Sequence, residues 1–251
     1  MVDYTAMLIV FERIARDAGD AIMSHYDQEC RLDDKSDASP LTAADLAADK
    51  IICAGLREAY PDIVLVTEEQ SETHETVKST DAFFLIDPLD GTKEFLSRNG
   101  QFTVNIALIE NGKPSAGVVF APALNRMFLG ASGFGSRETN AHETRTIHVR
   151  PAPAAKIAVA SRSHRSPETD SFLAANNITH CVSAGSSLKF CLVAAGEADI
   201  YPRFGTTMEW DTAAGQAILE AAGGTMLTPE GAAFLYGKPL HRNGNFIASG
   251  A

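Results

Sequence analysis

The sequence predicts an α/β protein, and three features of the 251-residue chain carry that prediction. Residues 3–26 have apolar side chains spaced three and four apart, as in an amphipathic helix. Short apolar runs between residues 63 and 130 are bounded by turn-forming residues, as strands are. From residue 156 to residue 222, strand-like and helix-like segments alternate, which is typical of a largely parallel sheet.

Composition indicates a globular chain of one large domain or two closely packed ones, with 45% hydrophobic and 21% charged residues. A core of this size needs no disulfide or structural metal. The cysteines show no CxxC spacing, which disfavours a zinc site or a redox pair. Reduced thiols are therefore expected at Cys30, Cys53, Cys181 and Cys191.

Charge and hydropathy narrow the class of partner. The net charge is 21 − 32 = −11, which argues against a nucleic-acid polymer, because such binding rests on basic surface. A small phosphate ester is not excluded, since divalent cations make an acidic pocket attractive to anions. No run approaches the ~18 apolar residues of a membrane span, and no secretory signal is found, so a cytoplasmic protein is expected.

The first half is predicted to begin with two helices. Residues 3–26 form the first, and a polar, loop-like stretch follows. The second helix is predicted to start after Thr42 and to run to about Tyr60, before Pro61. Thr42 and Asp45 resemble a capping box in which Asp replaces the usual Glu. A short apolar strand at residues 63–66 then ends in Glu68 and Glu69, at the carboxyl edge where open α/β sheets place ligands.

The segment 81–96 is the centre of the predicted site. Its first apolar residues indicate a buried strand, which Pro88 is expected to end at Asp87 because proline cannot continue the ladder. Asp90 follows in a turn with Gly91, and a short helix is predicted directly after it. The carboxylates suit Mg²⁺, and the amides that begin the helix suit a phosphate oxygen. Such a turn is also common on protein surfaces, so it gains weight only together with the rest of the chain.

Two strands, 103–109 and 115–121, are joined through an Asn-Gly pair and are predicted to form a β-hairpin. Residues 126–130 are a further candidate strand. The Gly-, Ser- and charge-rich residues 131–146 are interpreted as a link between two parts of the chain. These parts are an N-terminal α+β half, residues 1–135, and a C-terminal α/β half, residues 136–251.

The second half is predicted to contain strands at 156–160, 179–182 and 199–201 and helices at 166–176, 186–195 and 210–222. Ser186 would be the N-cap of the second of these helices. Asp211 lies at the start of the third, where an acid stabilises the helix dipole. Asp211 is also a candidate metal ligand. Together with Glu68, Asp87 and Asp90 it supplies the charge that two Mg²⁺ ions about 4 Å apart require.

Three segments resemble the signatures of the inositol monophosphatase superfamily: Glu68-Glu69, Asp87-Pro88-Leu89-Asp90-Gly91-Thr92 and Trp210-Asp211-Thr212-Ala213-Ala214-Gly215. Their order and approximate separations also match, and the resemblance covers nearly the whole chain. It implies an αβαβα layered sandwich and a Mg²⁺-dependent, lithium-sensitive phosphatase.

The resemblance also implies roles for single residues. Two or three Mg²⁺ ions would be held by Glu68, Asp87, Asp90, Asp211 and the carbonyl group of Leu89. Asp45, Thr92 and Glu68 would be catalytic, with Thr92 hydrogen-bonded to Asp45 and activating the attacking water. The amides of Gly91 and Thr92 would hold the phosphoryl oxygens.

Other segments resemble one branch of this superfamily, the bacterial 3′(2′),5′-bisphosphate nucleotidases of the CysQ type. They are Lys93-Glu94-Phe95 and residues 161–164, 185–191 and 199–205. These segments add His164, Lys189 and Arg203, which would balance a second phosphate that an inositol ring lacks. Ser186 and Asp211 complete the implied substrate-binding residues.

The resemblance therefore implies hydrolysis of the 3′-phosphate of adenosine 3′,5′-bisphosphate to AMP and phosphate in sulfate assimilation, with the 3′-phosphorylated sulfate donor as a second substrate. An inositol monophosphatase or broad sugar phosphatase is the alternative enzyme. A non-catalytic nucleotide or metal sensor is disfavoured because the set of acids is intact. Monomer and homodimer both remain open, as does a peripheral position on the cytoplasmic face of the inner membrane.

Overall fold

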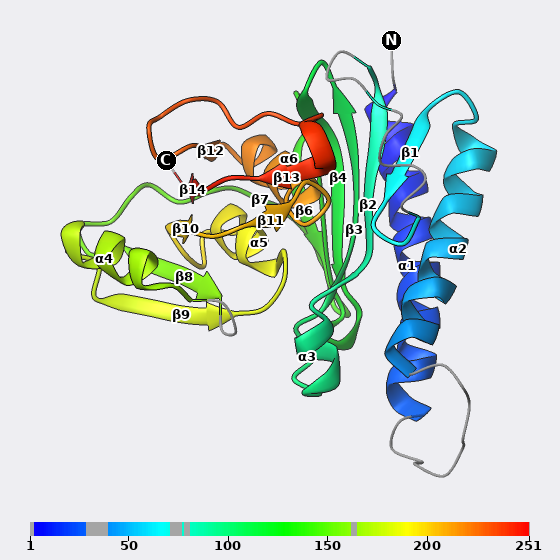
Figure 1. Ribbon diagram of the computed structural model, residues 1–251, viewed down its shortest axis with the longest axis horizontal. Coiled ribbons are helices and arrows are strands. Elements are labelled where there is room, and N and C mark those ends of the chain that lie inside the picture. The colour runs from blue at the N-terminus through cyan, green and yellow to red at the C-terminus, as the bar shows by residue number, and fades with distance from the viewer. Residues whose placement is uncertain (1–2, 29–39, 71–76, 78–80, 162–164, 251) are drawn as a thin grey trace.

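The computed structural model describes residues 3–28, 40–70, 77, 81–161 and 165–250. Its elements form five layers, and Figure 1 shows them roughly side by side. The outer helices α1 (Tyr4–Gln28) and α2 (Pro40–Ala59) cover one face of a seven-stranded sheet. Helices α5 (Leu188–Ala194) and α6 (Ala213–Ala221) separate it from a five-stranded sheet, and α4 (Pro167–Ala175) lies on the far side of that sheet. The predicted αβαβα sandwich is confirmed.

The large sheet has the strand order β1-β2-β3-β4-β5-β6-β7 and is antiparallel except for the parallel pair β1–β2. Its strands are β1 (Val64–Thr67), β2 (Phe83–Asp90), β3 (Thr103–Glu110), β4 (Lys113–Ala121), β5 (Arg126–Ala131), β6 (Gly135–Thr139) and β7 (Thr144–Ile147). The short helix α3 (Thr92–Leu96) follows β2 directly. The predicted hairpin is present as β3–β4, and Asn111 and Gly112 at its turn both have positive φ.

The second sheet has the order β12-β14-β10-β8-β9 and is mixed. Its strands are β8 (Ile157–Ser161), β9 (His180–Ala184), β10 (Ile200–Arg203), β12 (Thr225–Leu227) and β14 (Phe246–Ser249). β8 pairs in parallel with β9 and β10, as strand–helix alternation predicts. β14 runs antiparallel to β10 and β12, so the sheet is only partly parallel. A small ribbon of β11 (Thr207–Met208) and β13 (Arg242–Asn243) lies beside it.

Among the described residues, two large hydrophobic clusters cover the two faces of the large sheet, and a smaller third one packs α4 on the second sheet. In the first, the rings of Phe11 on α1 and Phe84 on β2 meet with centroids 5.8 Å apart. In the second, between the two sheets, Phe190 stacks on Phe246 at 5.5 Å. Gly117 permits α6 to approach the large sheet, because a Cβ atom there would lie 2.8 Å from a backbone oxygen of α6. The close contact of α6 with the sheet positions the loop that precedes this helix.

Several element boundaries differ from the sequence prediction. β2 does not stop at Asp87 but continues to Asp90. β1 ends opposite Ile86, so beyond that point β2 has a single neighbour, and the register shifts by one residue between Asp87 and Asp90. Proline is tolerated at such a bulge because its missing N–H breaks no ladder bond. Pro88 therefore kinks the strand without ending it.

Helix boundaries also move. α2 begins at Pro40, so Thr42 lies within its first turn and is not the N-cap. α5 begins at Leu188 with Ser187 as the N-cap, so the N-cap prediction for Ser186 is wrong. α6 begins at Ala213, which places Asp211 in the loop before the helix.

Residues 131–146 are not a link, because β6 and β7 extend the large sheet through this stretch. The predicted boundary at 135/136 falls at the first residue of β6. Glu138 in β6 is only 2% exposed, and it accepts hydrogen bonds from Arg126 at 2.6 Å and Arg145 at 2.7 Å. Paired charges thus replace the apolar residues that would have marked a strand. The division into two domains stays a prediction.

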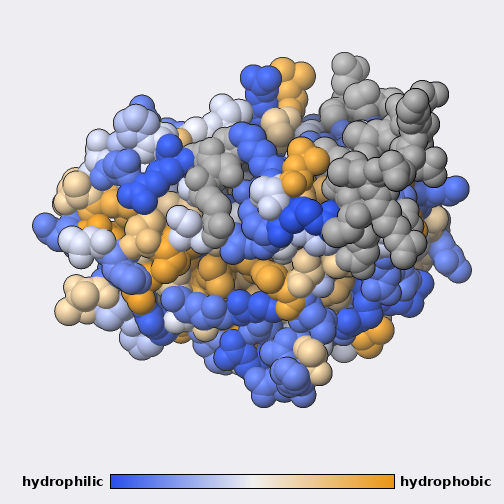
Figure 2. Space-filling view, turned by 90° about the horizontal axis from the view of Figure 1, so that it is seen from below, coloured by the Kyte–Doolittle hydropathy of each residue, from blue (hydrophilic) through white to orange (hydrophobic). Residues whose placement is uncertain are grey.

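Seen from below in Figure 2, hydrophilic side chains cover much of the molecule, with apolar side chains showing in a band between them. None of the helices in the described residues is long and apolar enough to cross a membrane.

Candidate active site

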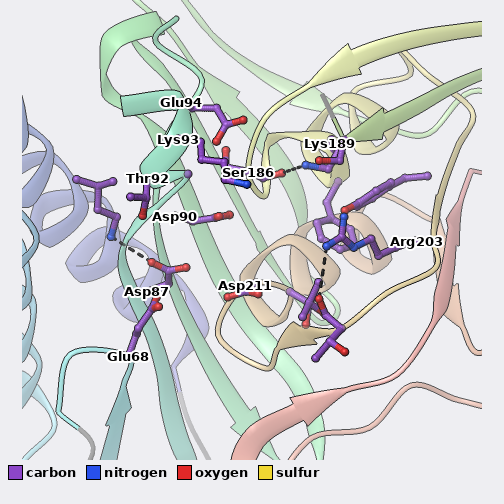
Figure 3. Close-up of a pocket in the computed structure, with 18 residues that line it drawn as sticks. Glu68, Asp87, Asp90, Thr92, Lys93, Glu94, Ser186, Lys189, Arg203 and Asp211 are labelled. Carbon is purple, nitrogen blue, oxygen red and sulfur yellow. Dashed lines mark hydrogen bonds between the residues drawn. The ribbon is translucent and has the colours of Figure 1, made fainter. Parts of the chain in front are cut away.

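A cavity of about 440 Å³ is lined by residues from both sheets and from the helices α3 and α5. Its walls come from the ends of β1 and β2, the start of α3, the segment before α5, and the loop before α6 (Figure 3). Many predicted site residues line it: Glu68, Asp87, Leu89, Asp90, Gly91, Thr92, Ser186, Lys189, Arg203 and Asp211. The fold thus gathers predicted site residues from positions 68 to 211 around one cavity.

Three of the acids approach one another closely. One carboxylate oxygen from each of Glu68, Asp87 and Asp211 lies within 4.8 Å of the others. Glu68 follows β1, Asp87 lies in β2, and Asp211 reaches in from the loop before α6. Asp90 lines the same cavity but lies outside this group of three. The predicted convergence of the acids is therefore present, with Asp90 beside the cluster.

Backbone amides fix two of these carboxylates. The N–H of Leu89 donates to Asp87 Oδ1 at 3.1 Å, across the bend that Pro88 introduces. The N–H of Met208 donates to Asp211 Oδ2 at 2.8 Å. Each bond uses one carboxylate oxygen and leaves lone pairs on the other for a further partner.

Burial and mutual repulsion raise the pKa values of the clustered acids. Burial and the charge of Asp90 raise the pKa of Asp211 to about 8. Part of Glu68 faces solvent, yet the loss of water around its carboxyl group, together with Asp90 and Glu69, raises its pKa to about 7. Asp87 is raised well above its ordinary value by burial and by Glu68. An acid cluster of this kind is relieved either by protons or by a cation.

The cluster fits Mg²⁺ on the chemistry of its donors. Hard divalent cations prefer carboxylate oxygens, and all three members of the cluster supply them. Besides burial, the main causes of the raised pKa of Asp87 are the negative charges of Glu68, Asp90, Asp211 and Asp45. A bound divalent cation would supply the missing positive charge.

Gly91 shapes the backbone beside the acids. Its φ of 98° is left-handed, a conformation that other residues rarely adopt. A Cβ atom there would lie 3.3 Å from Ser186 Cβ, from the Phe102 backbone and from a Glu94 carboxylate oxygen. A side chain at position 91 would therefore strain the turn and crowd the floor of the cavity.

Among the described residues, Asp45 and Thr92 do not make the contact with each other that the resemblance implies. Asp45 lies on α2, and burial together with the charges of Glu69, Glu68 and Asp49 raises its pKa to about 8. Thr92 is exposed at the first position of α3 and lines the cavity. No hydrogen bond joins Thr92 to Asp45 in the described part of the chain, so their predicted catalytic contact stays a prediction.

Cations form the opposite wall (Figure 3). The Lys189 side chain is 4% exposed and donates to the backbone oxygens of Ser186 and Ala184. Its ammonium group also lies 5.2 Å from the centre of the Tyr201 ring. Burial lowers the pKa of Lys189 to about 8, although the charge of Asp90 opposes this shift. Arg203 lies at the end of β10. His164, the third predicted cation, is outside the described residues.

Several polar residues of the site could not be singled out from the sequence, and Ser187 belongs to the segment 185–191 without an expected role of its own. Ser187 donates through its backbone N–H to Asp90 Oδ2 at 2.6 Å. Its hydroxyl contacts Thr103 and Asn105, which are buried in β3. Polar residues inside the otherwise apolar run 103–109 are the one signal that could have indicated them. Glu94, buried against Gly185, was quoted only as part of a motif.

Comparison with known proteins places the chain in a family. Residues 3–250 match the model of the inositol monophosphatase family, so the chain belongs to that family. It is 49% identical over 213 residues to the 3′(2′),5′-bisphosphate nucleotidase CysQ of Escherichia coli (strain K12), across 84% of this chain and 86% of that protein. The CysQ of Buchnera aphidicola is 42% identical over 240 residues, across 95% of this chain and 89% of that protein.

Solved structures agree with this placement. The crystal structure of CysQ from Bacteroides thetaiotaomicron superposes with a TM-score of 0.84 at 36% identity, covering 98% of this chain and 97% of that chain. An inositol monophosphatase from Anabaena has a TM-score of 0.78 at 24% identity, over 98% of this chain and 90% of that chain, and shows the shared fold. The family and fold that the motifs predict are both confirmed.

Proposed function

We propose that the protein is a Mg²⁺-dependent phosphatase that removes the 3′-phosphate of adenosine 3′,5′-bisphosphate. One observation carries the proposal: three carboxylates converge within 4.8 Å on one side of a cavity whose other side presents Lys189 and Arg203. The acids suit metal-assisted hydrolysis, and the cations suit a second phosphate. The similarity to the CysQ nucleotidases of other bacteria supports the same substrate.

Different residues of the chain are proposed to bind the metal ions and to orient the phosphate. Glu68, Asp87, Asp90, Asp211 and the Leu89 carbonyl would hold two or three Mg²⁺ ions. When bound, Mg²⁺ lowers the pKa of water and neutralises charge on the phosphoryl oxygens. The amides of Gly91 and Thr92 would orient the 3′-phosphate.

The reaction consumes one water molecule. Its oxygen forms a bond to phosphorus, the bond from phosphorus to the 3′-oxygen breaks, and the 3′-oxygen leaves with a proton. Thr92, Asp45 and Glu68 are proposed to align the water and to accept its proton. The products are AMP and inorganic phosphate.

The second phosphate is proposed to bind the far wall. Lys189 and Arg203 would pair with the 5′-phosphate, Ser186 would contribute its hydroxyl group, and His164 would add a further cation. Guanidinium and ammonium groups form strong, charge-assisted bonds to phosphate. The 3′-phosphorylated sulfate donor has the same 3′-phosphate and is proposed as a second substrate. Such a role in sulfate assimilation fits a cytoplasmic location.

Substrate profiling tests the proposal. Phosphate release is measured from adenosine 3′,5′-bisphosphate, inositol 1-phosphate and AMP, each with Mg²⁺ and with EDTA. We expect Mg²⁺-dependent release from the bisphosphate at a far higher kcat/KM than from the other two. Equal or faster release from inositol 1-phosphate would instead support an inositol monophosphatase. Absence of release from all three would support a non-catalytic sensor.

A further inference from the structure

The turn before α5 is fastened to β3 and to the segment preceding it. The N–H of Gly185 donates to Gln101 Oε1 at 3.0 Å, and the Ser186 hydroxyl donates to the Gln101 backbone oxygen at 2.9 Å. Ser186 adopts a left-handed φ of 44°, which is uncommon for serine. Three consecutive residues, 185–187, thus contact the large-sheet half of the molecule.

Ser187 makes the most buried of these contacts. Its hydroxyl lies 2.6 Å from Asn105 Oδ1 and 2.8 Å from Thr103 Oγ1. Ser187, Asn105 and Thr103 are 2%, 1% and 0% exposed. A hydroxyl has one hydrogen to donate, and the amide oxygen can only accept. The hydrogens therefore run in one order, from Thr103 to Ser187 and from Ser187 to Asn105.

The same residue holds Asp90. The backbone N–H of Ser187 donates to Asp90 Oδ2 at 2.6 Å, which leaves Oδ1 available to another partner. Without the hydroxyl contacts, the turn would lose its buried attachment to β3. The direction of this N–H depends on the turn, so the hydroxyl of Ser187 controls Asp90 indirectly.

We propose that Ser187 is a positioning residue for Asp90, acting through its hydroxyl contacts with Asn105 and Thr103. The inference rests on the proposed function, because it takes Asp90 to be a Mg²⁺ ligand. Partners that orient a metal ligand commonly contribute a factor of 10 to 100 in metal affinity. Ser187 would do so from the C-terminal half of the chain, joining that half to an acid of the N-terminal half.

The test compares Ser187→Ala with Thr103→Val and with a control. Mg²⁺ binding is measured by titration calorimetry on the full chain without substrate. We expect Ser187→Ala to weaken Mg²⁺ binding about tenfold and Thr103→Val to weaken it less, because Val keeps the shape and removes only the outer hydroxyl. Ser136→Ala is the matched control, since Ser136 is another buried serine and donates to the Ile218 backbone oxygen at 2.6 Å, away from the site. Its Mg²⁺ affinity should stay unchanged.

A kinetic readout separates positioning from general loosening of the fold. In Ser187→Ala, the Mg²⁺ concentration for half-maximal rate should rise about tenfold, and KM for adenosine 3′,5′-bisphosphate at saturating Mg²⁺ should change little. In an Asp90→Asn background, Ser187→Ala should have no further effect on Mg²⁺ affinity, because the two act as one unit.

Three results would overturn the inference. They are unchanged Mg²⁺ affinity in Ser187→Ala, an equal loss in Ser136→Ala, and an undiminished effect of Ser187→Ala in the Asp90→Asn background. If Asp90→Asn weakens Mg²⁺ binding while Ser187→Ala does not, this inference alone fails. If Asp90→Asn itself binds Mg²⁺ normally, the proposed metal site fails with it.

Discussion

The cavity has an acidic wall, formed by Glu68, Asp87, Asp90 and Asp211, and a cationic wall, formed by Lys189 and Arg203. The pKa shifts on the two walls have opposite directions. On the acidic wall, burial and repulsion raise the pKa values of Asp211 to about 8 and Glu68 to about 7. On the cationic wall, burial lowers the pKa of Lys189 to about 8. Asp211, Glu68 and Lys189 are therefore each shifted toward the neutral form, although all three line the same cavity.

This difference indicates what each wall binds. Salt bridges between the walls would satisfy both and close the cavity, but no ion pair is found between the acids of the cluster and Lys189 in the described residues. The clustered acids favour a bound cation, and the buried ammonium group of Lys189 favours a bound anion. A Mg²⁺-bound phosphate ester that carries a second phosphate supplies both.

The largest expected effect comes from removing one acid. Asp90→Asn should reduce phosphate release by more than about a hundredfold, since even residues that only orient metal ligands cost 10 to 100. The fold should persist, because an amide of the same shape relieves repulsion among the acids. Phosphate release and the melting temperature are measured together, with the exposed Asp62→Asn as the control. Full turnover in Asp90→Asn would show that Asp90 is not a Mg²⁺ ligand.

Removing one cation should affect the substrate selectively. Lys189→Met keeps the buried stem but loses the charge, which is worth about 1.5–3 kcal/mol in a bond to a charged group. KM for adenosine 3′,5′-bisphosphate should rise about 10- to 100-fold, while turnover of a monophosphate should change little. Steady-state kinetics on both substrates check this, and the exposed Lys113→Met is the control. Equal losses on both substrates would contradict the proposed role of Lys189 in binding the second phosphate.

The acidic wall also predicts how pH and Mg²⁺ act on stability. The folded acids titrate at about 6 to 8 and unfolded ones near 4, so between these values the metal-free folded chain holds more protons than the unfolded chain. Its stability should fall as pH rises through that window. Mg²⁺ should therefore raise the melting temperature more at pH 8 than at pH 6. Thermal unfolding with MgCl₂ or NaCl at matched ionic strength measures this, and equal shifts at the two pH values would count against the metal cluster.

The smallest expected effect comes from replacing the arginine of the cationic wall by lysine. Arg203→Lys keeps the charge and loses the planar, two-pronged donor geometry. kcat/KM for adenosine 3′,5′-bisphosphate should fall about five- to tenfold, consistent with losing about 1 kcal/mol from one hydrogen bond. Arg242→Lys, an exposed arginine, serves as the control. An unchanged kcat/KM would show that Arg203 contributes charge alone.

The sequence predicts regular elements where one periodicity dominates. The helix expected at 3–26 is α1, and the hairpin at Asn111-Gly112 is present, since hydrophobic spacing and turn chemistry are local. β6 was missed because Glu138 is buried through ion pairs with Arg126 and Arg145, so hydropathy does not reveal the strand. Local rules do not describe burial that depends on charges elsewhere in the chain.

In the candidate site, too, local sequence rules predict some residues and not others. Glu68, Asp87 and Asp211 could be singled out because each follows or precedes a recognisable element. Their convergence within 4.8 Å does not follow from local sequence rules, since it depends on how α6 packs on the large sheet. Ser187 and Asn105 were not predicted, because their contact joins residues 82 positions apart. The contact of Thr92 with Asp45 and the role of His164 stay predictions.

The central claim is that acids from distant segments hold divalent cations beside the phosphate site. A crystal grown with MnCl₂ and AMP, with anomalous diffraction recorded at the manganese edge, tests it directly. We expect anomalous peaks bounded by the carboxylates of Glu68, Asp87 and Asp211, with the nucleotide phosphate toward Lys189 and Arg203. A bound nucleotide in the cavity with no anomalous peak among those three carboxylates would contradict the account.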